Sequence, residues 1–362
     1  MPLHEVGYRA WRGGLRPPWT ASAVIAASGV RLAWKSSWLR RALLLAWSPT
    51  LFFAASFFAF EQAVEEGRLT SLTERAVAGR NLDGVGILGT VLSRTLGTPV
   101  RETRHADEAA RIVETRRLVW TRLLLAFMRA PQAVLLAIVI GLVAPALISG
   151  DLRAKAWLVY FTRPVGRAEY ILGKTAILAA IVAVITVLPA LALWIAGVMV
   201  SPSLAVAIQT WDLPARIAAA SLAVAVPTVC LALAFSSLTA ESRIASFAWF
   251  ATWAACWIAH AALATADVAA STERPAAVAE ERTVAVEPPR GLRWLARAAG
   301  LDGTVDRWAW VSPYHAIGVV QAWIFGIESR PRVVVPPAAA LAIVSLASCA
   351  ALAWRVAVPL RA

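Results

Sequence analysis

The chain has 362 residues, of which 59% are hydrophobic and only 16% are charged, whereas soluble globular domains are about 45–50% apolar and about 25% charged. This composition excludes an ordinary soluble protein and indicates a chain that resides in a lipid bilayer. The formal net charge is +13, but the basic residues gather at the ends of apolar runs and no aromatic-rich soluble module accompanies them. We therefore expect them to contact membrane lipid head groups, and we expect no nucleic-acid partner.

Six apolar runs are long enough to cross a hydrocarbon core of about 30 Å as helices. None of them contains Asp, Glu, Lys or Arg, which is what partitioning into lipid favours. The predicted fold class is therefore all-α, a polytopic membrane protein. Its six transmembrane helices are expected at residues 42–60, 131–149, 175–200, 217–235, 244–265 and 333–354.

The distribution of basic residues predicts the orientation of these spans. Lys and Arg are enriched in segments 1–41 and 150–174, which the positive-inside rule places in the cytoplasm together with 236–243 and 355–362. The external loops are then 61–130, 201–216 and 266–332. The loop 61–130 also carries many arginines, but loops longer than about 60 residues report orientation poorly. Acidic residues interspersed with these arginines indicate a folded or helical external element. We predict a multi-pass protein of the cell membrane, the cytoplasmic membrane of a bacterium.

Two shorter helical elements are expected outside the spans. Residues 23–41 mix apolar with basic side chains, which predicts an elbow helix lying in the inner membrane interface before the first span. In the external segment 266–332, the apolar stretch from Trp310 to Gly326 is too short to cross. It is interpreted as a short re-entrant or interfacial helix that leads into the last span.

The sequence shows no motif for catalysis, a cofactor or a metal. The cysteines Cys230, Cys256 and Cys349 all lie in apolar runs and are interpreted as small core residues. His260 is interpreted as a packed or interfacial histidine, with a substrate or metal contact as the alternative. Gly173, Lys174 and Thr175 match the end of a phosphate-binding loop, but Ala168 stands where its first glycine is required. We therefore expect ATP and magnesium to bind a separate chain.

The segment 150–174 is a compact basic element between two apolar runs. Four apolar residues recur there at the spacing of one helix face, namely Ala154, Trp157, Leu158 and Phe161. Pro164 ends this predicted helix, because proline lacks an amide proton and disfavours helical geometry in the preceding residue. Asp151 and Glu169 at its borders are predicted to pair with Arg153 or Arg167. An ordinary solvated connection between helices is the alternative interpretation.

This stretch resembles the membrane subunits of type-2 ABC transporters, the ABC-2 permeases. The likeness lies in a Pro-x-Leu-Ile ending of one apolar run, an acidic and a basic residue, an Arg-Pro pair, and Glu-Tyr-x-x-Gly-Lys opening the next run. In that family the corresponding loop docks on the ATPase. The resemblance implies that the coupling residues here are Asp151, Arg153, Trp157, Tyr160, Phe161, Arg163, Pro164, Glu169, Tyr170, Gly173 and Lys174.

The resemblance also implies a function. The chain would be the permease subunit of an ABC exporter, paired with a cytoplasmic ABC ATPase and with a second copy of itself, moving an unidentified substrate outward. Uncharged spans favour an amphiphilic or hydrophobic cargo. A secondary transporter or channel is the alternative, although ionisable residues inside the spans or internal repeats would then be expected. A membrane enzyme and a non-transporting anchor for an ATPase also stay open.

Overall fold

The structure is a computed structural model that describes residues 17, 19–67, 108–156, 165–272 and 307–357, and every regular element in these ranges is helical. The elements in chain order are α1 (Trp19–Lys35), α2 (Ser37–Glu65), α5 (Glu108–Phe127), the π-helix η1 (Met128–Gln132), α6 (Ala133–Arg153), α8 (Arg167–Ile185), α9 (Val187–Val200), α10 (Ala205–Gln209), α11 (Asp212–Leu238), α12 (Ser242–Thr272), the 3-10 helix η4 (Ala309–Val311), α14 (Pro313–Ile324) and α15 (Pro331–Ala357).

Six helical segments are long and apolar enough to cross a membrane. They are Ser37–Glu65, Ile112–Arg153, Arg167–Val200, Asp212–Leu238, Ser242–Ala266 and Pro331–Ala357. The described ranges thus confirm the all-helical fold class and the six candidate spans. Two of the spans are composite, because α5, η1 and α6 form one continuous helix and α8 continues into α9.

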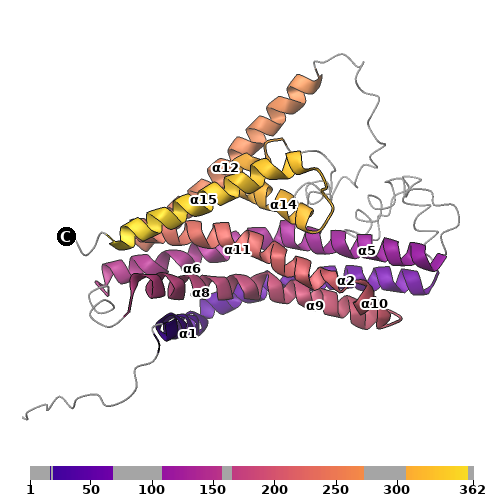
Figure 1. The fold of residues 1–362 in the computed structure, drawn as a ribbon, viewed down its shortest axis with the longest axis horizontal. Helices are drawn as coiled ribbons and strands as arrows, with labels where there is room; N and C mark the ends of the chain where they lie inside the picture. Colours follow the sequence, from indigo (N-terminus) through magenta and orange to yellow (C-terminus); the bar gives the residue numbers. More distant parts are fainter. Residues whose placement is uncertain (1–16, 18, 68–107, 157–164, 273–306, 358–362) are drawn as a thin grey trace, which may run out of the picture.

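The spans form an elongated bundle. Figure 1 shows α2, α5, α6, α8, α9 and α11 running along the long axis, with α12, α14 and α15 on one side of them. One buried apolar cluster surrounds Phe57 and Trp120, and a second surrounds Ile140, Ile181 and Trp249. The end of the bundle where α6 ends and α8 begins is called the hairpin end below. The end where α2 ends and α5 begins is called the distal end.

The helix Ile112–Arg153 has 42 residues, or roughly 63 Å at a rise of about 1.5 Å per residue. Its helical structure starts at Glu108, inside the segment 61–130 that was expected to be an external loop. Two buried charged residues in this part, Arg116 and Glu61, pair with each other. The Arg116 guanidinium donates to Glu61, with Nε 3.0 Å from Oε1 and Nη2 2.9 Å from Oε2, and Trp120 Nε1 donates to Oε1 at 2.9 Å. Pairing and hydrogen bonds offset much of the cost of burying these charges.

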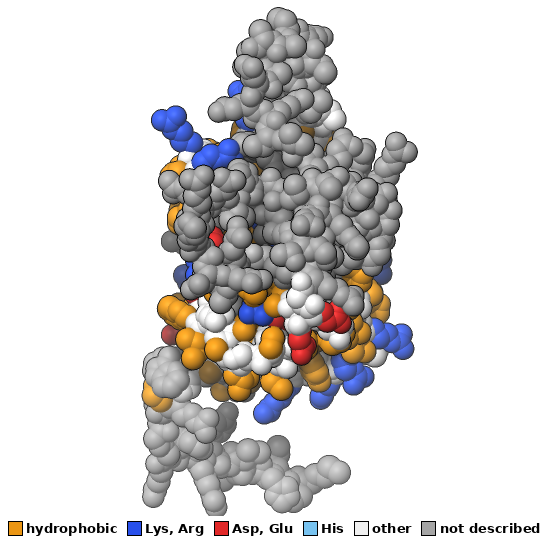
Figure 2. Space-filling view, turned by 90° about the vertical axis from the view of Figure 1, so that its right-hand side faces the viewer, with side chains coloured by type: hydrophobic (Ala, Val, Ile, Leu, Met, Phe, Trp, Pro, Cys, Tyr) orange, Lys and Arg blue, Asp and Glu red, His pale blue; other side chains and the backbone are white. Residues whose placement is uncertain are grey.

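A second ionic contact joins three helices at the distal end. Asp212 Oδ2 accepts hydrogen bonds from Arg117 Nη2 at 2.7 Å and from Arg216 Nε at 2.8 Å, and Arg216 Nη1 donates to the Ile324 carbonyl at 3.0 Å. The contact ties α5 and α14 to the first turns of α11. Figure 2 views the molecule from this end and shows acidic and basic side chains among apolar ones.

At the break between α8 and α9, a side chain from another helix supplies the hydrogen bond that a backbone carbonyl lacks. Pro189 has no amide proton, so the Ile185 carbonyl loses its usual partner within the helix. Gln132 Nε2 donates to that carbonyl at 2.7 Å, and only 1% of the Gln132 residue surface is exposed. The amide of Gln132 thereby fixes the bend of one span to the middle of another.

A serine hydroxyl is inserted into α6 after Pro145. Ser236 Oγ donates to the Pro145 carbonyl at 2.8 Å and accepts from the amides of Ile148 at 3.0 Å and Ser149 at 3.2 Å. In return, Ser149 Oγ donates to the Ser236 carbonyl at 2.8 Å. Both serines are fully buried. Side chains inserted into a helix ladder are a known cause of bending, and this one locks α6 to α11 one turn before the hairpin end.

We predict that Ser236→Ala lowers the free energy of unfolding by about 1–3 kcal/mol, because buried backbone groups of α6 lose their partner. Ser237→Ala is the matched control. Ser237 is equally buried, but its hydroxyl donates only to the Ala234 carbonyl of its own helix, so a loss below about 1 kcal/mol is expected. Denaturant titration of both variants in detergent micelles measures the difference, and equal losses would show that the inserted hydroxyl adds nothing.

Candidate functional site

The structure describes both ends of the predicted coupling loop. Residues 150–156 complete α6 and its last turn, and residues 165–174 begin α8. Five of the predicted coupling residues lie outside the described ranges, namely Trp157, Tyr160, Phe161, Arg163 and Pro164. The remaining six, Asp151, Arg153, Glu169, Tyr170, Gly173 and Lys174, lie on the two helix ends that carry this connection.

Asp151, Tyr170 and Lys174 form one polar cluster between the two helices. Lys174 Nζ lies 2.7 Å from Asp151 Oδ2, and Tyr170 Oη donates to the same oxygen at 2.7 Å. Lys174 Nζ also donates to the Leu147 carbonyl at 2.7 Å. The Tyr170 residue is 1% exposed and the Lys174 residue 7%. The sequence prediction paired Asp151 with Arg153 or Arg167, and this was wrong, because the partner that faces it across the hairpin is Lys174.

Gly173 provides the contact between α8 and α1. A Cβ atom at this position would lie 2.7 Å from Ile25 Cγ2 and 3.2 Å from the Ser22 carbonyl oxygen. Any larger residue therefore has to push α1 away. In Figure 1, α1 is seen nearly end-on beside α8, whereas the spans run along the long axis. The glycine thus has a packing role, and the predicted elbow segment contains a helix that packs on the start of α8.

Two further contacts connect the hairpin end to α11, α12 and α15. Arg153 Nη1 lies 4.0 Å from Glu241 Oε2, between side chains that are 61% and 57% exposed. Arg355 Nε donates to the Ser237 carbonyl at 3.3 Å, near the carboxyl end of α11. Because the Arg153 pair is exposed, its contribution to stability is small. It still places Arg153 at the surface next to the connection between α11 and α12.

Glu169 lies in the first turn of α8, and its carboxylate folds back over Gly166, the residue that caps this helix. A negative charge at this position interacts favourably with the amino-terminal end of the helix dipole. Glu169 therefore helps to define where α8 starts. It does not belong to the cluster of Asp151, Tyr170 and Lys174.

Sequence reasoning missed several residues that stabilise this site, namely Leu147, Ser149, Ser236, Glu241 and Arg355. The proline at position 145 signals that backbone groups of α6 lose their usual partners. No sequence pattern reveals that Ser236, on a distant helix, bonds the backbone of α6 after this proline. The serine pair Ser236 and Ser237, inside an apolar span, is the one sequence feature that indicates a polar contact between helices here.

The described surface of the hairpin end is rich in basic residues. Exposed lysines and arginines from the last turn of α6, the start of α8 and the start of α12 are Arg153, Lys155, Arg167 and Arg243, and α1 and the start of α2 add Arg31, Lys35, Arg40 and Arg41. Exposed acidic side chains in these same stretches are limited to Glu241. Such a surface attracts phospholipid head groups and acidic partner surfaces.

The described residues do not assemble a reaction centre. They contain no group of three or more His, Cys, Asp or Glu side chains that could hold a metal ion. His260 is 7% exposed, and its ring stacks on that of His315 with centroids 3.5 Å apart. This geometry favours the interpretation of His260 as a packed histidine. The hairpin end consists of two helix ends joined by a buried ion pair and bordered by exposed basic residues.

We predict that Asp151 and Lys174 are energetically coupled. Asp151→Asn or Lys174→Met alone is expected to cost about 2–3 kcal/mol, because each leaves a largely buried charged group without its partner. The double variant should recover about 1–2 kcal/mol of the summed loss. In the control cycle of Arg153→Gln and Glu241→Gln, the exposed pair should show a coupling below about 0.5 kcal/mol. Unfolding in micelles measures both cycles, and additive losses at Asp151 and Lys174 would contradict the prediction.

Comparison with known proteins agrees with this geometry. A family model described as ABC-2 family transporter protein matches residues 41–355, which includes all six candidate spans except the first residues of α2 and the last of α15. No curated protein matches the chain. Proteins of this kind are membrane components that typically lack an ATPase domain, and the family implies an ATPase partner. The chain belongs to the ABC-2 transporter family as a multi-pass membrane component.

Proposed function

We propose that this chain is the permease subunit of an ATP-driven exporter. ATP and magnesium would bind a separate cytoplasmic ABC ATPase, and hydrolysis there would drive an unidentified substrate outward. The observation that carries the proposal is the family match over residues 41–355. The reinforced hairpin between α6 and α8 supports the proposal, because only a rigid connection transmits a movement of the ATPase to the spans.

The proposed docking element is the hairpin connection 150–174. At its base, Lys174 holds both the Asp151 carboxylate and the Leu147 carbonyl, so the last turns of α6 are fixed to α8. One turn further inside, Ser236 fixes α6 to α11. A push on the connection is therefore passed to three spans at once. The apolar face that the sequence predicts, with Trp157 and Phe161, would fill a groove on the ATPase.

The distribution of basic residues supports a cytoplasmic hairpin end. The short connection between α9 and α11, at the distal end, contains no Lys or Arg from Ser201 to Trp211, whereas eight exposed basic residues lie at or near the hairpin end. Short loops with many lysines and arginines remain on the cytoplasmic side of membranes. In a bacterium this membrane would be the cytoplasmic membrane, and the ATPase would meet the chain from inside.

A second copy of the chain is the proposed membrane partner. Within the most apolar stretch of α12 only 11% of residues are buried inside the chain, compared with 56% for α11. Large apolar side chains on this helix, such as Phe247, Trp257 and Ile258, are exposed. Lipid covers such a face equally well in energetic terms, since the hydrophobic effect does not drive helix association inside a bilayer. The family resemblance favours a homodimer, and the exposed apolar face of α12 is the surface we propose for its interface.

We predict that Phe161→Asp and Arg163→Asp, made together, abolish co-purification of this chain with its proposed cytoplasmic ABC ATPase. The first change removes an apolar contact and the second reverses a charge. Arg332→Asp, which reverses an exposed charge at the start of α15, is the control and should keep the complex intact. In the same pull-down, two differently tagged copies of the chain should be recovered together. Undiminished capture of the ATPase by the double variant would refute the docking element.

A transport assay in vesicles separates the proposal from its alternatives. With the ATPase present, efflux of labelled amphiphiles should require ATP and persist after an ionophore collapses the proton gradient. Transport that follows the proton gradient without ATP would instead identify a secondary transporter or channel. ATP hydrolysis without transport of any tested amphiphile would favour a non-transporting anchor.

A further inference from the structure

Two of the three cysteines of the chain lie side by side on different spans. Cys230 is on α11 and Cys349 is on α15, and the thiol of Cys349 donates to the sulfur of Cys230 with the two Sγ atoms 3.3 Å apart. Both thiols are free. Because an S–S bond is about 2.05 Å long, the two sulfurs have to approach each other by only about 1.3 Å to become bonded.

The pair is accessible from the surface of α15. Cys349 is exposed, so it is not the small core residue that the sequence interpretation made of it, and Cys230 is half-buried. The residues of α15 that are buried in the bundle include Ser345, Ser348 and Leu352, and Cys349 lies at the edge of the face that they form. A small molecule dissolved in the bilayer can therefore reach the Cys349 sulfur without opening the bundle.

The helices around the pair are already held in register. α11 packs on α15, and Arg355 Nε of α15 donates to the Ser237 carbonyl of α11 at 3.3 Å. Ser237 lies seven residues after Cys230, and Arg355 lies six residues after Cys349. The two helices thus run in the same direction and keep nearly the same register over roughly 10 Å. A bond between the two sulfurs would close on a contact that the neighbouring residues already maintain.

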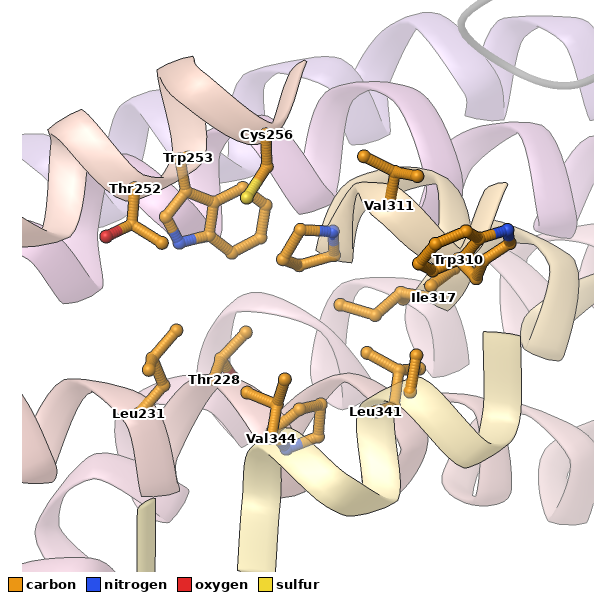
Figure 3. A pocket seen from close by; sticks show the side chains of 14 residues that line it. Thr228, Leu231, Thr252, Trp253, Cys256, Trp310, Val311, Ile317, Leu341 and Val344 are labelled. Carbon is orange, nitrogen blue, oxygen red and sulfur yellow. The ribbon is translucent and has the colours of Figure 1, made fainter. Parts of the chain in front are cut away.

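The third cysteine provides an internal comparison. Cys256 is on α12, and Figure 3 shows it next to Trp253 on the wall of a cavity of about 200 Å³ that α11, α12, η4, α14 and α15 line. Neither Cys230 nor Cys349 belongs to this lining. Cys256 is half-buried in a span, as Cys230 is, but it lies on another helix than the pair. Position alone therefore distinguishes it from Cys230.

We propose that Cys230 and Cys349 form a modification site, a dithiol that peroxides oxidise to a disulfide between α11 and α15. The Cys349 sulfur attacks one oxygen of hydrogen peroxide, the O–O bond breaks, water leaves with the thiol proton, and a sulfenic acid forms. The Cys230 sulfur then attacks the Cys349 sulfur, the S–S bond forms, and the hydroxyl leaves as a second water with the Cys230 proton. Two thiols are oxidised and one peroxide is reduced to two waters, so the reaction needs no further reactant.

A disulfide fits this site better than a soft metal ion does. Such a cation would need both cysteines as thiolates, and charged groups are costly in the apolar part of a span, whereas a disulfide is neutral. Because Ser236 already ties α11 to α6, the disulfide would extend this connection covalently to α15. The proposal holds with or without an ATPase partner and does not depend on the direction of transport.

The test uses the full chain in phosphatidylcholine vesicles that are treated with hydrogen peroxide and then denatured with a maleimide, which counts the remaining thiols. The unsubstituted chain should lose two of its three thiols, and Cys256 should keep its own. Mass spectrometry of an unreduced digest should find the peptides of Cys230 and Cys349 linked. In the matched control, Cys349→Ser with Ala350→Cys, the exposed thiol is turned by about 100° around α15. The linked fraction should fall at least about tenfold, because the sulfurs no longer face each other.

A second measurement uses the folded chain in micelles. A disulfide that closes a long loop restrains the unfolded chain, so peroxide should raise the unfolding midpoint of the unsubstituted chain and a membrane-permeant reductant should reverse the rise. Cys349→Ser should show no rise, and its midpoint without peroxide should match that of the reduced unsubstituted chain, which shows that it is folded. Three remaining thiols after peroxide, equal linking in the shifted control, or oxygen added to Cys349 without a link to Cys230 would overturn the proposal.

Discussion

The organisation of this chain depends on one constraint: in a hydrocarbon phase every backbone polar group has to find its partner within the protein. Prolines inside the spans remove such partners, and side chains from neighbouring helices supply replacements. The contacts that reach from one helix to a backbone carbonyl of another include those of Gln132 with Ile185, Ser236 with Pro145, Lys174 with Leu147, Trp47 with Val184 and Trp249 with Ala137. Each such contact joins two spans, and that of Gln132 also satisfies the carbonyl that Pro189 leaves without its helical partner.

These contacts gather where α6 meets α8 and α11, and this explains how a docking element could act on the membrane part. Asp151 and Lys174 close the base of the hairpin, and Ser236 holds α6 one turn further inside. Gly173 lets α1 approach α8 closely, so the helix before the first span belongs to the same rigid region. By contrast, α12 and α15 are connected through η4 and α14, and both have many exposed apolar side chains. The molecule thus combines a stiff hairpin end with a face that is open to lipid.

The sequence predicted the helical fold and the six spans because long runs without charges are sufficient to identify them. It indicated a folded or helical element in 61–130 but not that this helix continues into the second span, since Arg116 and Arg117 interrupt the apolar pattern, and their acidic partners Glu61 and Asp212 lie far away in the chain. In the candidate site, the identity of Asp151, Tyr170 and Lys174 was predicted but their pairing was not. Which residues face each other across a hairpin follows from helix rotation, and rotation is set by packing that a local pattern does not contain.

We propose that the connection between α6 and α8 lies in the cytoplasm and meets an ATPase there. Ala154→Cys, in a chain whose three native cysteines are replaced by serine, tests this most directly, because Ala154 is exposed beside the docking element. A membrane-impermeant maleimide should modify this cysteine in inside-out vesicles and not in sealed cells, and bound ATPase should protect it. Modification from the outside of sealed cells would contradict the account.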